Sequence, residues 1–148
     1  MRTEKARSAD AAAIAALEAA CFSDPWPEDF ILRRLDNFLV ARPENGEPGF
    51  SDSTAAGYVC LSHVLDEGSI DNIAVVPELR RRGLADALLD AAENEARALS
   101  LTFITLEVRA SNIPAIALYE KHGFTRVGLR RGYYEKPRED ALLMTKFL

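Results

Sequence analysis

The sequence predicts an α/β (α+β) fold in which a mixed β-sheet carries helices on both faces. Strand-like segments at 38–41, 56–64 and 69–76 come first along the chain. Two helix–strand alternations follow, and the strand between the two helices is almost wholly apolar, as in strands that are covered on both faces. With 148 residues, of which 48% are apolar and 28% charged, the chain has the length and composition of a single domain spanning 1–148.

Two short helices are predicted before the first strand. Ser8 or Asp10 can cap an alanine-rich helix over 11–20. Pro25-Trp26-Pro27 interrupts this helix, because proline has no N–H to donate and restricts the residue before it. A second helix is expected over 28–35. Its inward side chains are those of Phe30, Ile31 and Leu35.

The middle of the chain is predicted to contain a connection, a hairpin and a long helix. Proline, glycine, asparagine and serine residues at 43–54 mark a flexible connection after the first strand. A turn at 65–68 joins the next two strands. The helix expected over 82–99 has one apolar stripe that faces the core. This stripe consists of Leu84, Leu88, Ala91, Ala92, Ala96 and Leu99.

The last third is predicted to alternate between strand and helix. An apolar strand covers 101–108, and a helix over 112–121 ends at Gly123, a residue suited to the left-handed turn after a helix. Strands at 125–134 and 141–147 close the chain.

Charge and cysteine content exclude several classes of protein. The net charge of -5 and the pI of about 5.1 argue against direct nucleic-acid binding, which needs a basic surface. Cys21 and Cys60 make no disulfide framework, and no Cys/His spacing suits a zinc site, so both are expected as small apolar filler. Because no signal peptide and no apolar run of about 18 residues are visible, the expected location is cytoplasmic, without membrane contact.

A carboxylate and a phenol on adjacent elements indicate acid–base chemistry on a small group. Glu107 lies at the carboxyl end of the strand at 101–108, where open α/β sheets place their ligands. Tyr119 lies on the following helix, on the same face as Asn112. Two structural alternatives stay open: Glu107 could form an ion pair with Arg109 or another cation, and Tyr119 could pack its ring in the core.

A second segment of interest is the turn that opens the long helix. Helix N-termini present N–H groups and a partial positive charge, and the arginines at 80–82 add charge at the same place. Gly83 would let the backbone approach a phosphate closely. A capped, solvated turn is the alternative interpretation. The sequence has no Walker motif and no Gly-x-Gly-x-x-Gly, which weakens the ATP and dinucleotide interpretations.

These segments resemble the GCN5-related N-acetyltransferase (GNAT) family. Arg80-x-x-Gly83-x-Ala85 matches its Gln/Arg-x-x-Gly-x-Gly/Ala signature, with Ala85 in place of the commoner glycine. The segments 106–112 and 117–120 resemble the RimI-type branch, which acetylates protein N-termini. The resemblance implies a GNAT fold, with helices on both faces of a mixed sheet whose fourth and fifth strands splay apart at one end.

The resemblance also assigns roles to individual residues. It makes Glu107 the general base and Tyr119 the proton donor of an acyltransferase that uses acetyl-CoA as co-substrate, without a metal. It implies that the co-substrate is bound by Ile73, Ala74, Val75, Arg80, Arg81, Arg82, Gly83, Leu84, Ala85, Asp86 and Asn112.

On the acceptor side, the resemblance implies that Trp26, Tyr133 and Tyr134 line a groove for the acceptor peptide. Trp26 could instead pack only in the core, and the two tyrosines could form a cross-strand aromatic pair beside an exposed charged turn. The implied reaction is direct transfer of acetyl to a protein N-terminal amine, with the N-terminal alanine of a small-subunit ribosomal protein expected.

Alternatives to this function stay open. The acceptor could be a lysine, another N-terminus or a small metabolite. From other classes, the chain could be a non-catalytic acyl-CoA-binding module or a ribosome-associated binding protein, although the low pI fits the last poorly. A ping-pong reaction would instead use Cys60 or Cys21 as the acyl carrier.

Overall fold

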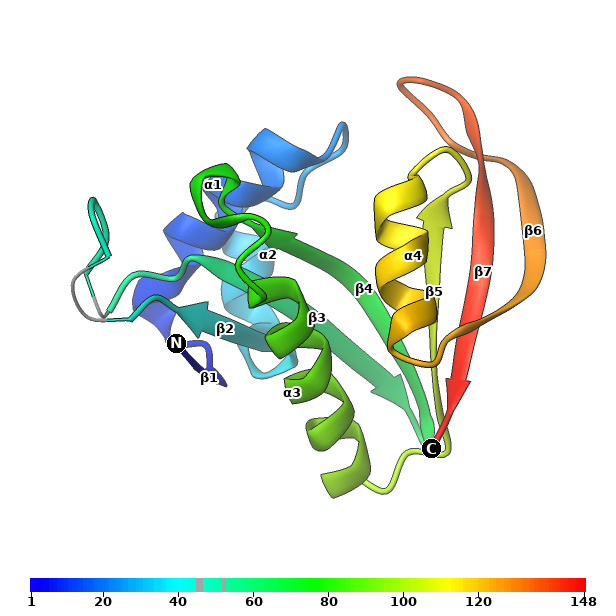
Figure 1. The fold of residues 1–148 in the computed structure, drawn as a ribbon, viewed down its shortest axis with the longest axis horizontal. Coiled ribbons are helices and arrows are strands. Elements are labelled where there is room, and N and C mark those ends of the chain that lie inside the picture. The colour runs from blue at the N-terminus through cyan, green and yellow to red at the C-terminus, as the bar shows by residue number, and fades with distance from the viewer. Residues whose placement is uncertain (45–46, 52) are drawn as a thin grey trace. The chain divides into compact units, whose positions relative to one another are not determined.

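The computed structural model describes residues 1–44, 47–51 and 53–148, which form a seven-stranded mixed sheet (Figure 1). The strand order is β1 (Arg2–Lys5), β2 (Phe38–Arg42), β3 (Gly57–Val64), β4 (Glu67–Val75), β5 (Phe103–Arg109), β7 (Glu139–Phe147) and β6 (Thr125–Tyr134). The α-helices are α1 (Ala11–Cys21), α2 (Glu28–Arg33), α3 (Leu84–Ala98) and α4 (Ile113–Lys121), and short 3-10 helices cover Ser8–Asp10, Leu35–Asn37 and Pro77–Leu79. This arrangement confirms the predicted α/β (α+β) class.

The sheet is mixed because β4 and β5 run parallel, whereas β1–β2, β2–β3, β5–β7 and β6–β7 are antiparallel. The parallel register joins Glu67–Ile70 of β4 to Phe103–Leu106 of β5. The splaying of these two strands stays a prediction.

The chain forms two compact units, each made of two separate segments. Unit 1 contains Met1–Leu61 and Asn72–Ala92, and unit 2 contains Ser62–Asp71 and Glu93–Leu148. The strands β3 and β4 and the helix α3 contribute residues to both units. The single-domain organisation over 1–148 stays a prediction.

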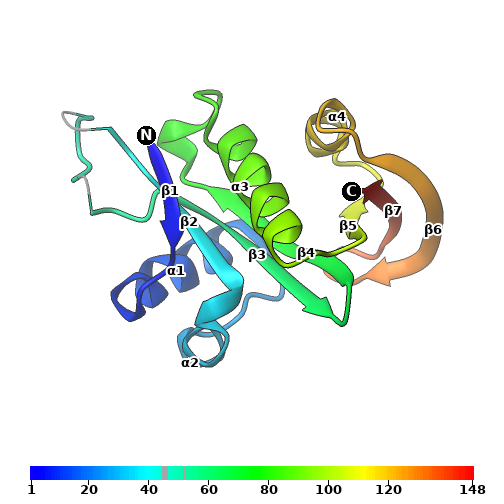
Figure 2. The same ribbon diagram turned by 90° about the horizontal axis from the view of Figure 1, so that it is seen from below.

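In unit 1, α1 and α2 lie on one face of the strands, and the residues of α3 that belong to this unit lie on the other (Figure 2). The core between α1, α2 and the strands consists of Ala11, Ile14, Leu17, Ile31, Phe38, Val40, Ala55, Tyr58, Cys60 and Ala74. Gly57 permits the close approach of α3 to β3, because a Cβ there would lie 3.0 Å from the Ala74 carbonyl oxygen and 3.2 Å from Leu88 Cδ1. Cys60 is buried apolar filler as predicted, whereas Cys21 is half-buried.

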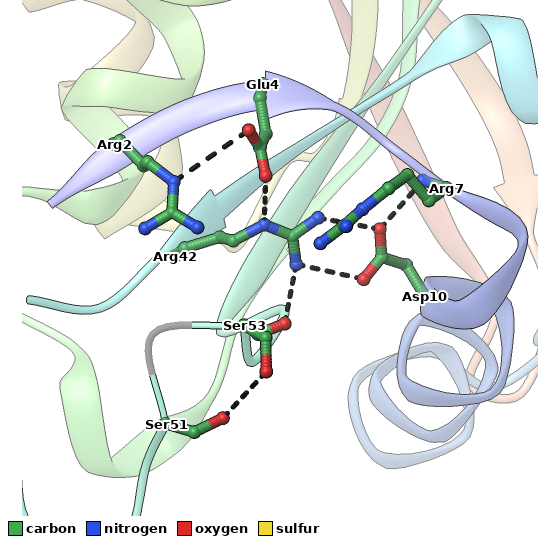
Figure 3. A network of polar contacts seen from close by, with 7 residues as sticks. All are labelled: Arg2, Glu4, Arg7, Asp10, Arg42, Ser51 and Ser53. Carbon is green, nitrogen blue, oxygen red and sulfur yellow. Dashed lines mark hydrogen bonds and ion pairs between the residues drawn. The ribbon is translucent and has the colours of Figure 1, made fainter.

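A buried arginine, which was not predicted, joins the N-terminal elements of unit 1 (Figure 3). The Arg42 Nη1 and Nη2 atoms each lie 2.9 Å from an oxygen of Asp10, and Nη1 also donates to the Ser53 carbonyl at 2.7 Å. The Arg42 Nε atom pairs with Glu4 on β1. The burial of this cation is tolerated because each of its three guanidinium nitrogens has an oxygen partner.

Asp10 precedes α1 as predicted, but its side chain does not cap the helix. The carboxylate accepts the backbone N–H of Arg7 at 2.8 Å and pairs with Arg42 instead. Although burial acts to raise it, these hydrogen bonds hold the pKa of Asp10 below its ordinary value.

In unit 2, α4 packs beside β5, and the strands β5, β7 and β6 form an antiparallel layer (Figure 1). The apolar strand β5 has a different environment from the predicted one. Ile104, Leu106 and Val108 are buried, whereas Thr105 and Glu107 on the other face are half-buried. One face of β5 therefore belongs to the core, and the other remains accessible to a polar side chain.

Several element boundaries differ from the predicted ones. The helix α2 ends at Arg33, so Leu35 falls in the next 3-10 helix and is half-buried. Because α3 ends at Ala98, Leu99 leaves the predicted stripe and is 44% exposed. The hairpin turn shortens to Leu65 and Asp66, since β4 already begins at Glu67.

Three residues of the predicted connection at 43–54, Asn45, Gly46 and Asp52, lie outside the described residues. In the part of the chain that the structure describes, no helix has both the length and the apolar character needed to span a membrane.

Candidate active site

Glu107 lies on the accessible face of β5 in unit 2, opposite Leu143 of β7. Its side chain is 27% exposed, and its Oε1 atom lies 3.2 Å from Arg130 Nε on β6. The Tyr133 phenol donates a hydrogen bond to the same carboxylate. The alternative of an ion pair at the strand end is thus confirmed, with Arg130 as a cation beside Glu107.

Arg109 belongs to a different contact set at the end of the β6–β7 hairpin. Its Nη1 atom lies 3.3 Å from Glu139 Oε1 and donates to the Pro137 carbonyl at 2.9 Å. Its guanidinium carbon lies 4.5 Å from the centroid of the Tyr134 ring, within the range of a cation–π contact. Arg109 therefore holds the hairpin turn and the Tyr134 ring.

Tyr133 and Tyr134 contact each other on β6 rather than pairing across strands. Their ring centroids are 5.0 Å apart and the rings are perpendicular. The hydrogen bond to Glu107 raises the pKa of Tyr133, with burial as the second cause. Burial raises the pKa of Tyr134 to about 12, and the charge of Glu107 adds to this effect. The predicted exposed, charged turn is confirmed at residues 135–138.

Tyr119 is 7% exposed on α4, and its ring packs edge-on against Phe124 with centroids 6.0 Å apart. Core packing of the ring, one of the two alternatives for this residue, is thus confirmed. Burial raises the pKa of Tyr119 above its ordinary value, and Tyr134 contributes to the shift. The charge of Glu107 raises the pKa of Tyr134, and Tyr134 in turn raises the pKa of Tyr119. These three side chains of unit 2 therefore interact electrostatically.

Asn112 begins this helix as predicted. Its Oδ1 atom accepts the Ala115 N–H at 3.3 Å, so the side chain caps α4. The helix ends before Gly123, whose φ of +91° is the left-handed conformation expected there. Asn112 is exposed, unlike Tyr119. A contact of Asn112 with the co-substrate stays a prediction.

The predicted phosphate-binding turn lies in unit 1, between the 3-10 helix at Pro77–Leu79 and α3. Arg81 and Gly83 both adopt left-handed backbone conformations, with φ of 65° and 82°. A Cβ at Gly83 would meet no heavy atom within 4 Å, so φ rather than crowding favours glycine there. The predicted helix start at 82 moves to Leu84 for this reason, since Gly83 has no helical conformation.

The side chains of this turn form a cationic surface at the start of α3. Arg80, Arg81 and Arg82 are exposed, whereas Leu84 is buried and Ala85 and Asp86 are half-buried. Arg80 donates to Cys21 Sγ at 3.6 Å, and Arg82 pairs with Glu47. Exposed arginines at a helix N-terminus are the donor set that suits an anionic pyrophosphate.

The remaining predicted residues also lie in unit 1. Ile73 is half-buried and Ala74 and Val75 are buried in the last part of β4. Trp26 packs against Phe30 and Phe38, with centroid distances of 5.3 and 5.9 Å, so its role in the core is confirmed. Contact of these four residues with co-substrate or acceptor stays a prediction.

Two residues of interest were missed in the sequence. No motif marks Arg130, and its contact with Glu107 depends on a strand pairing that the sequence does not display. Glu18 is fully buried in α1. Its position four residues after the core residue Ile14 placed it on the buried face, and this spacing could have identified it. Among the described residues, no cluster of three His, Cys, Asp or Glu side chains could hold a metal ion.

Comparison with known proteins agrees with the motifs. The family model "Acetyltransferase (GNAT) family" matches residues 11–124. The [Ribosomal protein bS18]-alanine N-acetyltransferase of Escherichia coli K12 is 37% identical over 134 residues, covering 86% of this chain and 84% of the relative. N-alpha-acetyltransferase RimI of Mycobacterium tuberculosis is 38% identical over 145 residues, covering 93% and 87%.

The fold agrees as well. The crystal structure of the ribosomal-protein-S18-alanine N-acetyltransferase from Escherichia coli superimposes with a TM-score of 0.84 at 32% identity, covering 99% of this chain and 92% of that one. The match of the family model to most of the chain and the likeness to these relatives lead to one conclusion: the chain belongs to the GNAT acetyltransferase family, in which acetyl-CoA is the acyl donor.

Proposed function

We propose that this chain transfers the acetyl group of acetyl-CoA to the N-terminal alanine of ribosomal protein bS18. The observation that carries the proposal is the likeness to two N-terminal acetyltransferases at 37% and 38% identity over most of the chain. The group around Glu107 in unit 2 supports it, because a carboxylate beside a phenol on an accessible strand face suits proton removal from an amine.

Acetyl-CoA binding is assigned to two segments of unit 1. The turn at 80–83 and the first residues of α3 present cations and backbone N–H groups, which match the pyrophosphate. The backbone of Ile73–Val75 is assigned to the pantetheine arm. Gly83 adopts φ of +82° to open this turn, so the turn's shape depends on a residue without a side chain. Acetyl-CoA supplies the thioester that the amine attacks.

Glu107 is proposed to accept the amine proton, directly or through a water molecule, as the amide bond forms and the thioester C–S bond breaks. An α-amine has a pKa of about 8, so roughly a tenth is already neutral at pH 7. A carboxylate that is a weak base therefore suffices for an α-amine. A lysine amine, with a pKa of about 10.4, is almost wholly protonated at pH 7 and would need a stronger base. The ion pair with Arg130 leaves Glu107 available, because the Arg130 side chain is 56% exposed and the pair is screened by water.

Tyr119 is proposed to act on the leaving sulfur. Burial keeps its phenol protonated at any working pH, because the pKa of Tyr119 lies above its ordinary value. A thiol with a pKa near 8.5 is a stronger acid than such a phenol. Tyr119 therefore stabilises the leaving thiolate mainly by donating a hydrogen bond, and the thiolate takes its proton from solvent water as CoA leaves.

Tyr133, Tyr134 and Trp26 are proposed to contact the acceptor peptide. Tyr133 is half-exposed and already hydrogen-bonded to Glu107, so a peptide amine that approaches the carboxylate passes its ring. Tyr134 is held in place by Arg109. A ring that packs against this guanidinium suits a wall that positions a peptide backbone.

A peptide panel tests the proposed function. Free CoA release is measured with acetyl-CoA and peptides that carry the bS18 N-terminal sequence but differ in the first residue, together with one peptide whose α-amine is blocked and whose internal lysine is free. The proposal expects turnover with the alanine peptide and little with the blocked one. Equal turnover on the blocked peptide would assign the chain to lysine acetylation, and acetyl-CoA binding without turnover on any amine would assign it to a non-catalytic module.

A further inference from the structure

Glu18 on α1 is a fully buried carboxylate that the proposed chemistry does not use. Its carboxylate accepts hydrogen bonds from three elements of unit 1. The Tyr58 phenol on β3 donates at 2.6 Å, and the backbone N–H of Trp26 donates at 3.2 Å. The Asn72 amide on β4 donates to both oxygens, at 3.1 and 3.0 Å.

The chemistry of these partners requires an acceptor. The Trp26 N–H and the Asn72 Nδ2 group can only donate, and the Tyr58 hydroxyl donates to Oε2. An ionised carboxylate accepts all of these bonds, whereas an amide at the same place would turn its own N–H groups toward donors. Burial raises the pKa of Glu18, although the three partners oppose this effect.

The partners of Glu18 are next to residues of two proposed binding segments. Trp26 belongs to the acceptor side, and its ring is also held by Phe30 and Phe38. Asn72 directly precedes Ile73–Val75, to which the pantetheine arm is assigned. One side chain thus fixes the backbone at Trp26 and the side chain of Asn72, the residue directly before the co-substrate segment of β4.

We propose that Glu18 is a positioning residue that fixes the Trp26 segment against the co-substrate segment of β4, so that acceptor and acetyl-CoA meet a preset geometry. The proposal rests on the proposed function for its effect on catalysis, but the geometry of Trp26 can be measured without it. Removing Glu18 releases the Trp26 backbone and the Asn72 side chain together, although neither residue is itself changed.

The experiment compares two isosteric changes of buried carboxylates in the same unit, Glu18→Gln and Asp10→Asn. Asp10 pairs with Arg42 and has no contact in common with Glu18, so its variant controls for loss of stability alone. Trp26 is the only tryptophan in the sequence, so its fluorescence reports this segment directly. Acrylamide quenching, the acetyl-CoA dissociation constant, and kcat and KM for the alanine peptide are measured for both variants.

The proposal expects Glu18→Gln to increase the quenching of Trp26 and to raise the peptide KM about tenfold, with a smaller change in kcat. Asp10→Asn is expected to lower the melting temperature and to leave quenching and KM near those of the wild type. If Glu18→Gln does not fold, Tyr58→Phe removes one of the donors and should move quenching and KM in the same direction by less.

Equal quenching and equal KM in Glu18→Gln and Asp10→Asn at matched stability would overturn the proposal. If the wild type turns over no peptide, the proposed function fails, and Trp26 quenching with the acetyl-CoA dissociation constant still decides the role of Glu18. In that case, unchanged Trp26 quenching and an unchanged acetyl-CoA dissociation constant in Glu18→Gln would overturn the positioning role of Glu18. Increases in both quantities would support it.

Discussion

Arg130 Nε lies 3.2 Å from Glu107 Oε1, so the proposed general base forms an ion pair with a cation from the closing hairpin. The two side chains come from β6 and β5, which are not neighbours in the sheet, since β7 lies between them. The Arg130 side chain is more than half exposed, and such pairs contribute little to folding. The contact therefore orients Glu107 more than it stabilises the fold.

Arg130→Gln is expected to change the free energy of unfolding by less than about 1 kcal/mol, because the lost ion pair is solvent-exposed. We expect the turnover to become less sensitive to salt, since the charge beside Glu107 is removed. Urea unfolding and kcat/KM at two ionic strengths measure both effects. The matched control is Arg126→Gln, which breaks the exposed ion pair between Arg126, also on β6, and Glu120 on α4. If Arg126→Gln changes the salt dependence as strongly, the effect does not come from Glu107.

Tyr119→Phe should retain the fold, because the ring keeps its edge-on contact with Phe124 and only the hydroxyl is lost. We expect kcat to fall about 10- to 100-fold, with little change in the acetyl-CoA KM, since a hydrogen bond to the leaving sulfur is made mainly in the transition state. Steady-state kinetics and a melting curve check this. A normal kcat at unchanged melting temperature would restrict Tyr119 to a packing role.

Gly83→Ala should weaken acetyl-CoA binding, because alanine disfavours the φ of +82° that shapes the turn before α3. The cost in folding free energy is expected to be about 1 kcal/mol. Gly49→Ala is the matched control, since Gly49 has a φ of +83° and a Cβ added there would also meet no heavy atom within 4 Å. Isothermal titration should show a larger dissociation constant for Gly83→Ala alone. Equal weakening by both variants would contradict a specific role of the turn.

The pH dependence of stability should reveal the burial of Glu18. Its pKa in the folded chain lies above the ordinary value of 4.5, so the folded state binds more protons than the unfolded state between these two values. Relative to Glu18→Gln, the wild type therefore loses stability as the pH rises from about 4.5 through the pKa of Glu18 in the folded chain. Below and above this pH range, the difference in unfolding free energy between the two proteins is constant. Urea unfolding of both proteins across the acidic and neutral range measures this. A difference that grows in favour of the wild type with rising pH would contradict it.

Local signals predicted much of the fold. The strand at 125–134 has the predicted bounds, and α4 begins after Asn112 and ends before Gly123, because the cap and the left-handed turn are properties of those residues. The strand β1 was not predicted. Its residues Arg2–Lys5 have no apolar alternation, and the strand forms by pairing with β2, whose partner residues lie 34 to 40 positions away in sequence.

The candidate site was predictable where chemistry follows a motif and not where it depends on distant contacts. Glu107, Tyr119 and Gly83 could be selected from the strand, the helix and the turn on which they lie. The partner of Glu107 could not, because the contact with Arg130 depends on the register of the hairpin. The partners of Glu18 could not be predicted for the same reason, since Tyr58 and Asn72 lie 40 and 54 residues away from it.

The most direct test of the central claim is the intact mass of ribosomal protein bS18 after incubation with acetyl-CoA and either the wild type or Glu107→Gln. The account predicts the mass gain of a single acetyl group with the wild type, located by fragmentation on the N-terminal alanine. With Glu107→Gln we expect the initial rate to fall about 10²-fold. Glutamine has nearly the same shape as glutamate, but its neutral amide cannot accept the amine proton. No mass gain with the wild type, or acetyl groups on lysines alone, would contradict N-terminal acetylation, and an unchanged rate with Glu107→Gln would contradict the role of Glu107.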